Sequence, residues 1–423
     1  MTPNSQLSRF ILASGTTNLA DGIAVVVWAW IATLLTRDPF LIALMPVALR
    51  LPWFLFALPA GIVTDRVDRR QLILAMDILR TLAFAAAALA VLLSLPLAQP
   101  VDDGASMPGL FAMLFGCALV VGTAEVFRDN AAQTMLPTFV PHDQLEKANG
   151  RLWSVELVGN ALLGPALGAF LIAALIWLPF AANSVAYAVA AMLILGMKGA
   201  FLPKARKTRN WRTELGEGLA YLRQAPLLRL LAVVTGFWNL FDQMVLIALV
   251  LYAQEVLGLG AQGYGLMLAA AAIGGIAGGF CADAIVRRLG PGRSAQWAQL
   301  LSAVAFIAIP FAPNAIALAL ILASFQFVGL VWNTVSVSYR QRTIPDALLG
   351  RVNSVYRLLA WGMMPIGLLL SGALVSASED LVARETALSL PFLVAAIGVT
   401  LLSVLTWKPL GQGFAKCTPQ GAS

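Results

Sequence analysis

Long apolar segments separated by short polar ones are the feature that most restricts the fold of this sequence. Residues 10–35 form the first such segment, and residues 40–63 form the second with a single charge, Arg50. About 20 apolar residues suffice to cross the hydrocarbon core of a bilayer as an α-helix. The 423-residue chain is 60% hydrophobic and 12% charged. It therefore has room for about a dozen spans and is predicted to be an all-α membrane protein.

The predicted spans fall into two halves on either side of a polar stretch. In the first half we place them at 10–35, 40–63, 72–95, 109–127, 152–176 and 180–197. Spans 7 and 8 lie between 230 and 295, and the last four lie at 296–311, 316–338, 352–376 and 387–407. The predicted organisation is a six-helix bundle over 1–197, a cytoplasmic linker with an amphipathic helix over 198–229, a second bundle over 230–407, and a cytoplasmic tail over 408–423.

The formal net charge of +7 follows from membrane topology. If the N-terminus is inside, nearly all of the 28 lysines and arginines fall in inner loops, whereas only Arg37 and Arg384 fall in outer ones. This asymmetry is the positive-inside rule. It predicts that both termini are cytoplasmic, and it gives no reason to expect a nucleic-acid partner.

Few residues in the sequence could carry enzyme chemistry. The three cysteines, Cys117, Cys281 and Cys417, are far apart, and the single histidine, His142, lies in a polar loop. Neither a metal-ligand spacing nor a phosphate-binding G-x-x-x-x-G-K-[ST] motif occurs. We expect no cofactor, no metal site and no enzymatic activity.

The first span contains an aspartate at mid-membrane depth. Asp21 lies roughly 16 Å along the helix from its start, at ~1.5 Å per residue. Asn18, Asp21 and Trp28 share one helix face. A carboxyl at this depth must line a cavity or find a partner, which makes Asp21 a candidate proton-binding residue. The alternative is a hydrogen bond that only packs helices.

The second half repeats the first. Asn239–Asp242 (N-L-F-D) match Asn18–Asp21 (N-L-A-D) at an offset of 221. Gly279, Asp283, Arg287 and Arg288 match Gly61, Asp65, Arg69 and Arg70 at an offset of 218, and Pro345, Leu349, Asn353 and Gly372 match Pro141, Leu145, Asn149 and Gly168 at an offset of 204. Three matches in order, with one loop explaining the change of offset, indicate a parallel duplication.

The turn after the second span, G-I-V-T-D-R-V-D-R-R from Gly61 to Arg70, is strongly cationic. We expect Gly61 to allow close approach of a neighbouring backbone and Asp65 to cap a helix. Arg66, Arg69 and Arg70 can clamp carboxylates or bind lipid phosphate. The alternative is a turn that only fixes topology.

This turn and its repeat resemble the signature of the major facilitator superfamily. The resemblance implies twelve helices in two pseudo-symmetric six-helix bundles, with the turns acting as a conformational gate. It also implies that Glu125, near the inner end of the fourth span, pairs with an arginine of the turn, for which we take Arg69. The phrase L-P-T-F-V-P at 136–141 is typical of bacterial multidrug, macrolide and siderophore exporters.

The fifth span carries part of the superfamily's antiporter signature. Gly164, Pro165 and Gly168 match its G-P-x-x-G core, whereas Asn160 and Ala169 stand where the family has glycine. Proline kinks a helix and glycines permit tight contact. A kinked helix without significance for transport is the alternative reading.

The sequence thus predicts a monomer that exports a small amphipathic molecule, drug-, macrolide- or siderophore-like, by proton antiport. The candidate proton-coupling residues are Asp21, Asp242 and Glu156, in that order. Candidate cavity residues are Asn18, Trp28, Arg50, Asn239, Gln326, Asn333 and Trp361. The alternatives are a proton-coupled symporter or facilitator that imports a solute on the same fold, and a membrane enzyme or receptor with transporter architecture.

Overall fold

The computed structural model describes residues 3–64, 66–136, 139, 151–152, 154–197, 199, 201 and 211–417. Within these residues, twelve helices are long and apolar enough to cross a membrane, which confirms the predicted all-α membrane architecture. The chain forms two compact units. Unit 1 comprises Met1–Thr208 and Leu259–Ala269, and unit 2 comprises Arg209–Gly258 and Ala270–Ser423.

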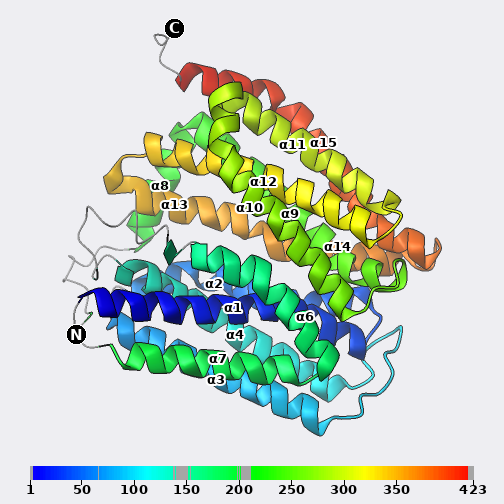
Figure 1. Cartoon of the computed structure of the whole chain (residues 1–423). Coiled ribbons are helices and arrows are strands. Elements are labelled where there is room, and N and C mark those ends of the chain that lie inside the picture. The colour runs from blue at the N-terminus through cyan, green and yellow to red at the C-terminus, as the bar shows by residue number, and fades with distance from the viewer. Residues whose placement is uncertain are drawn as a thin grey trace. The chain divides into compact units, whose positions relative to one another are not determined.

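The helices of unit 1 pack around a shared interior (Figure 1). They are α1 (Pro3–Leu35), α2 (Pro39–Thr64), α3 (Arg69–Leu93), α4 (Pro108–Met135), a π-helical segment η3 (Leu157–Leu163), α6 (Gly164–Ala174) and α7 (Leu178–Leu195). Extensive contacts join α3 to both α4 and α7, and α1 to both α7 and α6. The helices α1, α3, α4 and α7 therefore enclose the interior in which the candidate site lies.

Unit 2 contains the remaining helices. They are α8 (Trp211–Gln224), α9 (Pro226–Glu255), α10 (Ala261–Leu289), α11 (Pro291–Ala308) with the 3-10 turn η4 (Ile309–Phe311), α12 (Ala315–Thr343), α13 (Asp346–Trp361), α14 (Met363–Ser378) and α15 (Arg384–Cys417). The division into units places the first nine residues of α10 with unit 1. Among the helix pairs of unit 2, α11 packs with α15, and α9 packs with α14 and α15.

Proline and side-chain caps set where several helices begin. Proline occupies the first turn of α4, α6, α7, α9 and α11. The absent N–H of proline costs nothing there, because helix-initial N–H groups have no partner within the helix. At α3 the side chain of Asp68 accepts from the N–H of Gln71, and at α12 the side chain of Asn314 accepts from the N–H of Ala317.

A single glycine connects α10 to α11. Gly290 has a φ of 80°, in the left-handed region that side chains with a Cβ rarely adopt, and Pro291 follows at once. Glycine ends the first helix and proline starts the second without intervening residues. The repeat of the cationic turn therefore lies mostly within α10, whereas the first copy spans the loop between α2 and α3.

Helices approach most closely at glycines outside the two cationic turns. A Cβ on Gly164 would lie 2.5 Å from the Cα of Gly22, and one on Gly168 would lie 2.8 Å from the carbonyl oxygen of Ile23. This confirms the tight contact expected from the glycines of the fifth span. The expectation for Gly61 was wrong: within the described residues, nothing lies within 4 Å of the Cβ position of Gly61 or of its repeat, Gly279.

The fifth span is interrupted before its proline. Residues 157–163 form the π-helical segment η3, and the N–H of Gly164 bonds to the carbonyl of Gly159, five residues back. Proline at position 165 can donate no such bond, which favours a local change in winding. Single-turn π segments are rare and often lie at functional sites. Here the segment packs against α1 beside Asp21, since a Cβ on Gly159 would lie 3.1 Å from the backbone nitrogen of Leu19.

The fourth span extends further than predicted. Its helix continues to Met135, whereas the pattern suggested an end at Phe127. The prediction stopped where the charged residues Arg128 and Asp129 begin. Both continue the helix because they pair within unit 1, and Glu125 consequently lies ten residues before the end of α4 rather than at its end.

The predicted tail at 408–423 also begins too early. Helix α15 runs to Cys417, and Leu410 and Phe414 are buried. These two residues are four apart and share one helix face, which packs into the core of unit 2. Only residues 418–423 of the predicted tail lie outside the described chain.

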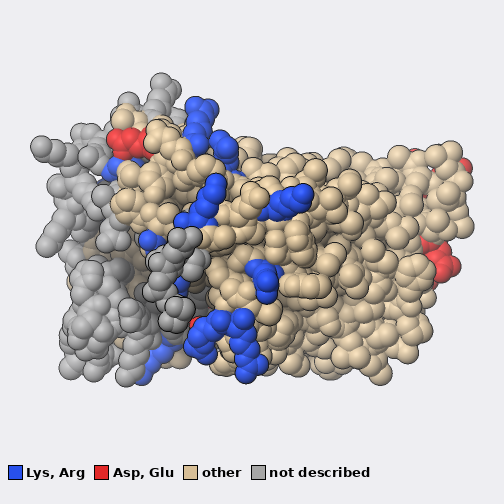
Figure 2. Space-filling view, turned by 90° about the horizontal axis from the view of Figure 1, so that it is seen from above, with Lys and Arg blue, Asp and Glu red and all other residues tan. Residues whose placement is uncertain are grey.

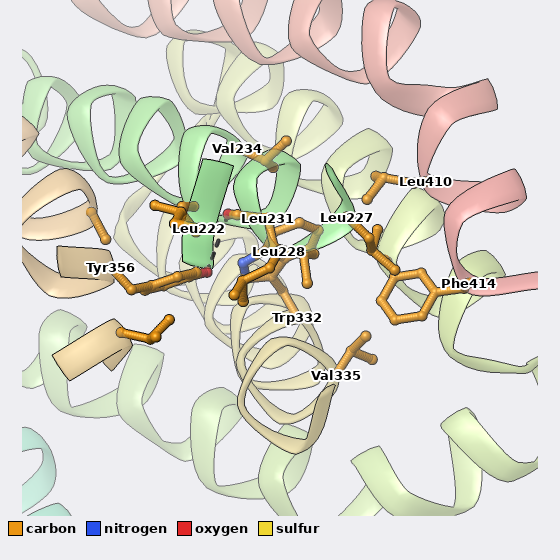
Figure 3. Close-up of a cluster of buried hydrophobic side chains, with 14 of the residues drawn as sticks. Leu222, Leu227, Leu228, Leu231, Val234, Trp332, Val335, Tyr356, Leu410 and Phe414 are labelled. Atoms are coloured by element: carbon orange, nitrogen blue, oxygen red, sulfur yellow. Dashed lines mark hydrogen bonds between the residues drawn. The ribbon is translucent and has the colours of Figure 1, made fainter. Parts of the chain in front are cut away.

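The predicted amphipathic linker helix exists as α8, but its apolar face is buried in protein. Leu222 is 2% exposed and joins a cluster with Leu227, Leu231, Tyr356 and Phe414 (Figure 3). The carboxylate of Glu217 on α8 also pairs with Arg351 on α13. Helix α8 therefore packs against the bundle of unit 2 instead of lying free at a membrane interface.

The two ends of the unit 2 helices differ in charge. The last turn of α10 carries Arg287 and Arg288, and the last turn of α12 carries Arg340 and Arg342. By contrast, α9 ends at Glu255. On the face drawn in Figure 2, most lysine and arginine side chains gather toward one end, whereas acidic side chains are seen at both ends. This distribution follows the positive-inside pattern predicted from the sequence.

Candidate functional site

A buried ion pair lies at the centre of unit 1. The guanidinium Nη2 of Arg80 on α3 bonds to the carboxylate of Asp21 on α1. It also donates to the hydroxyl oxygen of Tyr187 on α7 at 2.7 Å, and that hydroxyl donates to Asp21 Oδ1 at 2.6 Å. The Arg80 side chain is fully buried and that of Asp21 is 17% exposed. Three helices thus hold one carboxylate in a closed, charge-assisted triangle.

The ring of Tyr187 also supports this arginine. The guanidinium carbon of Arg80 lies 4.1 Å from the ring centroid, within the range of a cation–π interaction. The ring of Phe84 stacks on that same tyrosine ring, with the centroids of Phe84 and Tyr187 5.4 Å apart. The triangle is therefore surrounded by aromatic rings, a setting in which an uncompensated charge is costly.

A second ion pair lies one helical turn away. Arg128 Nε on α4 is 3.4 Å from Asp77 Oδ1 on α3, and Arg128 Nη1 is 3.5 Å from Asp129 Oδ1. The Asp77 side chain is fully buried and that of Arg128 is 4% exposed. Asp77 and Arg80 are three residues apart, a spacing that allows a pair along α3. Each instead pairs with a residue of another helix, because α1 and α4 present opposite charges at the same level.

Glu125 lies near this cluster but does not pair with Arg69. Its carboxyl is close enough to interact electrostatically with Asp21, Arg80 and Arg50. Arg69 Nη1 donates to the backbone carbonyl of Thr134 at 2.8 Å. Nine residues separate Glu125 from Thr134, which is about 13 Å along a helix. In this conformation the turn therefore contacts the end of α4, and Glu125 belongs to the interior.

The other residues of the cationic turn close the inner end of unit 1. Arg70 donates to the carbonyls of Ile194 and Leu195 at 3.1 Å and 2.6 Å, at the C-terminal end of α7. Asp68 Oδ2 accepts from the backbone N–H of Phe201 at 2.9 Å. Cations at helix C-termini are favourable because the last carbonyls lack partners within the helix. Arg66 is exposed, and Asp65 lies outside the described residues.

The repeated turn in unit 2 makes simpler contacts. Arg287 Nη1 pairs with Asp283 Oδ2 at 2.5 Å, one helical turn back along α10, and both side chains are more than two-thirds exposed. Arg288 is also exposed. A solvent-exposed pair of this kind contributes little to stability. The role of both turns as a conformational gate stays a prediction.

Two of the cavity candidates in unit 1, Trp28 and Asn18, have different surroundings. Trp28 is 1% exposed, and its ring contacts Phe84 and Phe180 at centroid distances of 5.8 Å and 5.1 Å. A shared face with Asp21 does not distinguish a residue packed between helices from one that lines a cavity, so the cavity role of Trp28 stays a prediction. Asn18 Nδ2 donates to the carbonyl of Ser14 at 2.8 Å within α1.

The unit 2 candidates divide into buried and exposed ones. Asn239 is 8% exposed and donates to the carbonyl of Ala360 at 3.0 Å, so it joins α9 to α13. Gln326 and Asn333 are exposed and lie seven residues apart on the same face of α12. Trp361 is half-buried, with the guanidinium of Arg357 5.2 Å from its ring centroid.

The remaining coupling candidates occupy different surroundings. Asp242 Oδ2 accepts from Gln243 Nε2 at 3.0 Å, so its polar contacts include a neutral neighbour on the same helix. Glu156, just before η3, is exposed and interacts electrostatically with Asp129 and Asp21. Within the described ranges, no group of three or more His, Cys, Asp or Glu residues could hold a metal ion.

Sequence reasoning missed Arg80, Asp77, Arg128 and Tyr187 as partners of the site. Two signals were available. Asp77 and Arg80 are charges well inside a predicted span, and such residues have to be paired. Arg128 was assigned to a loop because the preceding apolar run was taken as the whole span. Tyr187 gives no sequence signal, since a single tyrosine in an apolar helix is common.

Twelve apolar helices with an ion-paired interior define a multi-pass membrane protein. The chain belongs to the transmembrane secretion effector family of the major facilitator superfamily (MFS_3), whose model matches residues 4–410. This membership confirms the superfamily recognised from the cationic turn.

Several known proteins are similar over nearly the whole chain. The multidrug efflux pump Tap of Mycolicibacterium fortuitum is 27% identical, over 95% of this chain and 96% of its own. The multidrug efflux pump Tap of Mycobacterium tuberculosis (strain H37Rv) is 26% identical, over 91% of this chain and 90% of its own.

Solved structures show the same fold. A bacterial homologue of the human lysosomal transporter Spinster superposes with a TM-score of 0.74 at 14% identity, over 99% of each chain. A D-xylose–proton symporter superposes with a TM-score of 0.75 at 13% identity, over 96% of this chain and 98% of its own. The predicted major facilitator fold is therefore confirmed.

Proposed function

We propose that this transporter exports a small amphipathic molecule, drug-, macrolide- or siderophore-like, across the bacterial inner membrane by proton antiport. The observation that carries this proposal is the Asp21 carboxylate, which lies in the interior of unit 1 with a buried arginine as its partner. In a low-dielectric interior, the charge state of one member of such a pair controls the other. A proton on Asp21 removes the attraction that holds Arg80 in place.

This arrangement can link proton binding to a change of conformation. The Asp21–Arg80–Tyr187 triangle joins α1, α3 and α7, so neutralising Asp21 weakens a contact among three helices at once. The π segment and the glycines of the fifth span pack against α1 beside it. A change at Asp21 therefore reaches the helix that carries the antiporter-like residues Gly164, Pro165 and Gly168.

The direction of transport rests on the relatives. The Tap proteins of Mycolicibacterium fortuitum and Mycobacterium tuberculosis are multidrug efflux pumps. We carry export and a drug-like substrate to this chain from that similarity. The symporter among the fold neighbours is too distant in sequence to favour import.

The first test is a transport screen. Cells that express the chain should accumulate less of at least one dye, macrolide or siderophore than cells without it. In everted vesicles an imposed proton gradient should drive that compound inward, and the Asp21→Asn protein should bind it without driving it uphill. Uphill transport by Asp21→Asn would exclude Asp21 as the coupling residue and pass the test to Asp242, then to Glu156. Gradient-driven movement in the opposite direction would identify a symporter.

Topology is tested separately. With both termini inside, a single cysteine at position 102 should react with an impermeant thiol reagent from outside the cell. One at position 207, in the linker and outside the described residues, should react only after the membrane is opened. Labelling of position 207 from outside would overturn the proposed orientation.

A further inference from the structure

Helices α3 and α4 carry opposite charges at two levels, one helical turn apart, and a salt bridge joins the two helices at only one of these levels. This salt bridge is the pair between Asp77 on α3 and Arg128 on α4. Consecutive spans connected by a loop run antiparallel. A step of three residues toward the C-terminus of α3 therefore runs in the same direction as a step of three residues toward the N-terminus of α4. These steps lead from Asp77 to Arg80 and from Arg128 to Glu125. Residues three apart share a helix face. Glu125 therefore faces Arg80 one helical turn away from the Asp77–Arg128 salt bridge.

Charge interactions agree with this geometry. The carboxyl of Glu125 is attracted by Arg80 and repelled by Asp21, and Arg50 on α2 contributes a weaker attraction. The other charged or titratable groups that face the cluster are Asp77 on α3, Arg128 and Asp129 on α4, Tyr187 on α7, and Glu156 before η3. Arg128 is shared between Asp77 and Asp129, which leaves Arg80 as the cation between Asp21 and Glu125.

Arg80 has donors to spare for a second partner. Its Nη2 makes both bonds of the present arrangement, to Asp21 and Tyr187. Its Nε and Nη1 are buried and make no hydrogen bond with the described residues. A guanidinium presents five N–H donors in a fixed fork, so a small rotation about the side chain can exchange one carboxylate for another.

We propose that Arg80 is a switchable counter-ion with two carboxylate partners, Asp21 on α1 and Glu125 on α4, and that Glu125 receives it when Asp21 is neutralised. The coupling role of this exchange rests on the proposed function, whereas the exchange itself does not. Glu125 is then a positioning residue: it lets Asp21 take up a proton without leaving Arg80 as an uncompensated buried cation.

A double-mutant cycle in purified protein tests the shared arginine. Asp21→Asn and Glu125→Gln each leave Arg80 one carboxylate, so each variant should unfold at a temperature close to wild type. The combined variant leaves neither, and its Tm should fall below the sum of the single effects by about 10 °C. The matched control is Asp21→Asn with Asp283→Asn, which should be additive, because Asp283 pairs with Arg287 at an exposed position of unit 2. Additivity in the first pair would overturn the proposal.

A combined variant that fails to fold is still informative. Adding Arg80→Gln removes the stranded cation, so the triple variant should be recovered as folded protein. Glu125→Asp, which keeps the charge, should restore most of the Tm in the Asp21→Asn background where Glu125→Gln does not. If neither change recovers stability, Arg80 is not what the two carboxylates share.

The structure of the Asp21→Asn variant gives the direct test. Its Arg80 guanidinium should lie within hydrogen-bond distance of Glu125, and a guanidinium that stays on Tyr187 and residue 21 would refute the exchange. Neither measurement needs a transported compound. A failed transport screen would remove the proposed function and leave the exchange standing, whereas successful transport with an additive cycle would remove only the exchange.

Discussion

The two units repeat one sequence pattern but have different interiors. At the offset of 218 that relates the cationic turns, Asp77 and Arg80 correspond to Ala295 and Ala298. At the offset of 204 that applies after the outer loop, Arg128 corresponds to Trp332. All three counterparts are buried. The charged cluster of unit 1 is thus replaced by small and aromatic residues in unit 2.

Unit 2 builds its interior polar contacts from neutral groups. The hydroxyl oxygen of Tyr356 lies 2.7 Å from Thr235 Oγ1 and 2.8 Å from Ser336 Oγ, and it donates to the carbonyl of Leu231 at 3.1 Å. Trp332 Nε1 donates to Thr235 Oγ1 at 3.3 Å. Among the described residues of unit 2, every salt bridge joins side chains that are partly exposed. Buried ion pairs seldom stabilise a fold more than apolar residues of similar size do. We interpret the ions of unit 1 as serving transport rather than folding.

The largest expected difference between the units concerns transport. Asp21→Asn should abolish accumulation driven by a proton gradient, because no ionisable group then opposes Arg80 on α1. Asp242→Asn, at the equivalent position, should reduce it by less than about tenfold, or about 1.4 kcal/mol, since Asp242 has a neutral neighbour in Gln243. The measurement is uptake into everted vesicles at matched protein levels. Equal losses in both variants would show that the two units share the coupling.

Stability should respond more strongly to a lost charge in unit 1. Arg128→Gln leaves the fully buried Asp77 without its partner and should cost about 3–5 kcal/mol of unfolding free energy. Trp332→Phe, at the equivalent position of unit 2, removes one neutral hydrogen bond and should cost about 1 kcal/mol. Thermal unfolding in detergent measures both. The control is Asp77→Asn with Arg128→Gln, which should recover most of the loss. A wild-type Tm for Arg128→Gln would contradict this.

The two buried tyrosines sharpen the same contrast at smaller scale. Tyr187→Phe removes hydrogen bonds to two charged groups and should cost about 1.5–3 kcal/mol. Tyr356→Phe removes bonds to neutral groups and should cost about 1 kcal/mol. The comparison uses the Tm of each variant against wild type. A larger loss at Tyr356 would mean that the neutral network carries more of the stability.

Close packing at glycine should be alike in both units. Gly22→Ala on α1 and Gly367→Ala on α14 each place a Cβ against a backbone carbonyl, and each should cost about 1–3 kcal/mol. Gly61→Ala is the matched control. It has open space and lies within a helix, so it should stabilise by about 0.5–1 kcal/mol. A destabilised Gly61→Ala would restore the close approach that the motif suggested.

The membrane architecture followed from the sequence because span length and loop charge are local properties. The apolar runs and the asymmetry of arginine and lysine predict the helices and their alternation, and the position of Asp21 near the middle of α1 predicted a partnered carboxylate. The duplication also follows from spacing alone. Two helix ends were predicted too early, because α4 continues to Met135 and α15 continues past Leu410. Ion pairing in α4 and core packing in α15 let these more polar segments stay helical.

The partners within the site were not accessible to the same reasoning. Asp77 and Arg80 are one turn apart on α3, and sequence distance favours their pairing with each other. The structure pairs them with α4 and α1, because tertiary packing brings opposite charges closer than the helix turn does. Tyr187 lies 107 residues from Arg80, and nothing in an apolar helix marks it as the third member.

The arginines at the inner end of unit 1 act at two different times. In the proposed topology, Arg9 and Arg70 are free positive charges that keep their segments on the cytoplasmic side while the chain enters the membrane. In the folded protein, Arg9 Nη1 donates to the carbonyl of Gly196 at 2.9 Å, and Arg70 donates to those of Ile194 and Leu195. The same groups that first orient α1 and α3 later close the end of α7. A neutral substitution at either arginine would therefore impair membrane insertion and stability together.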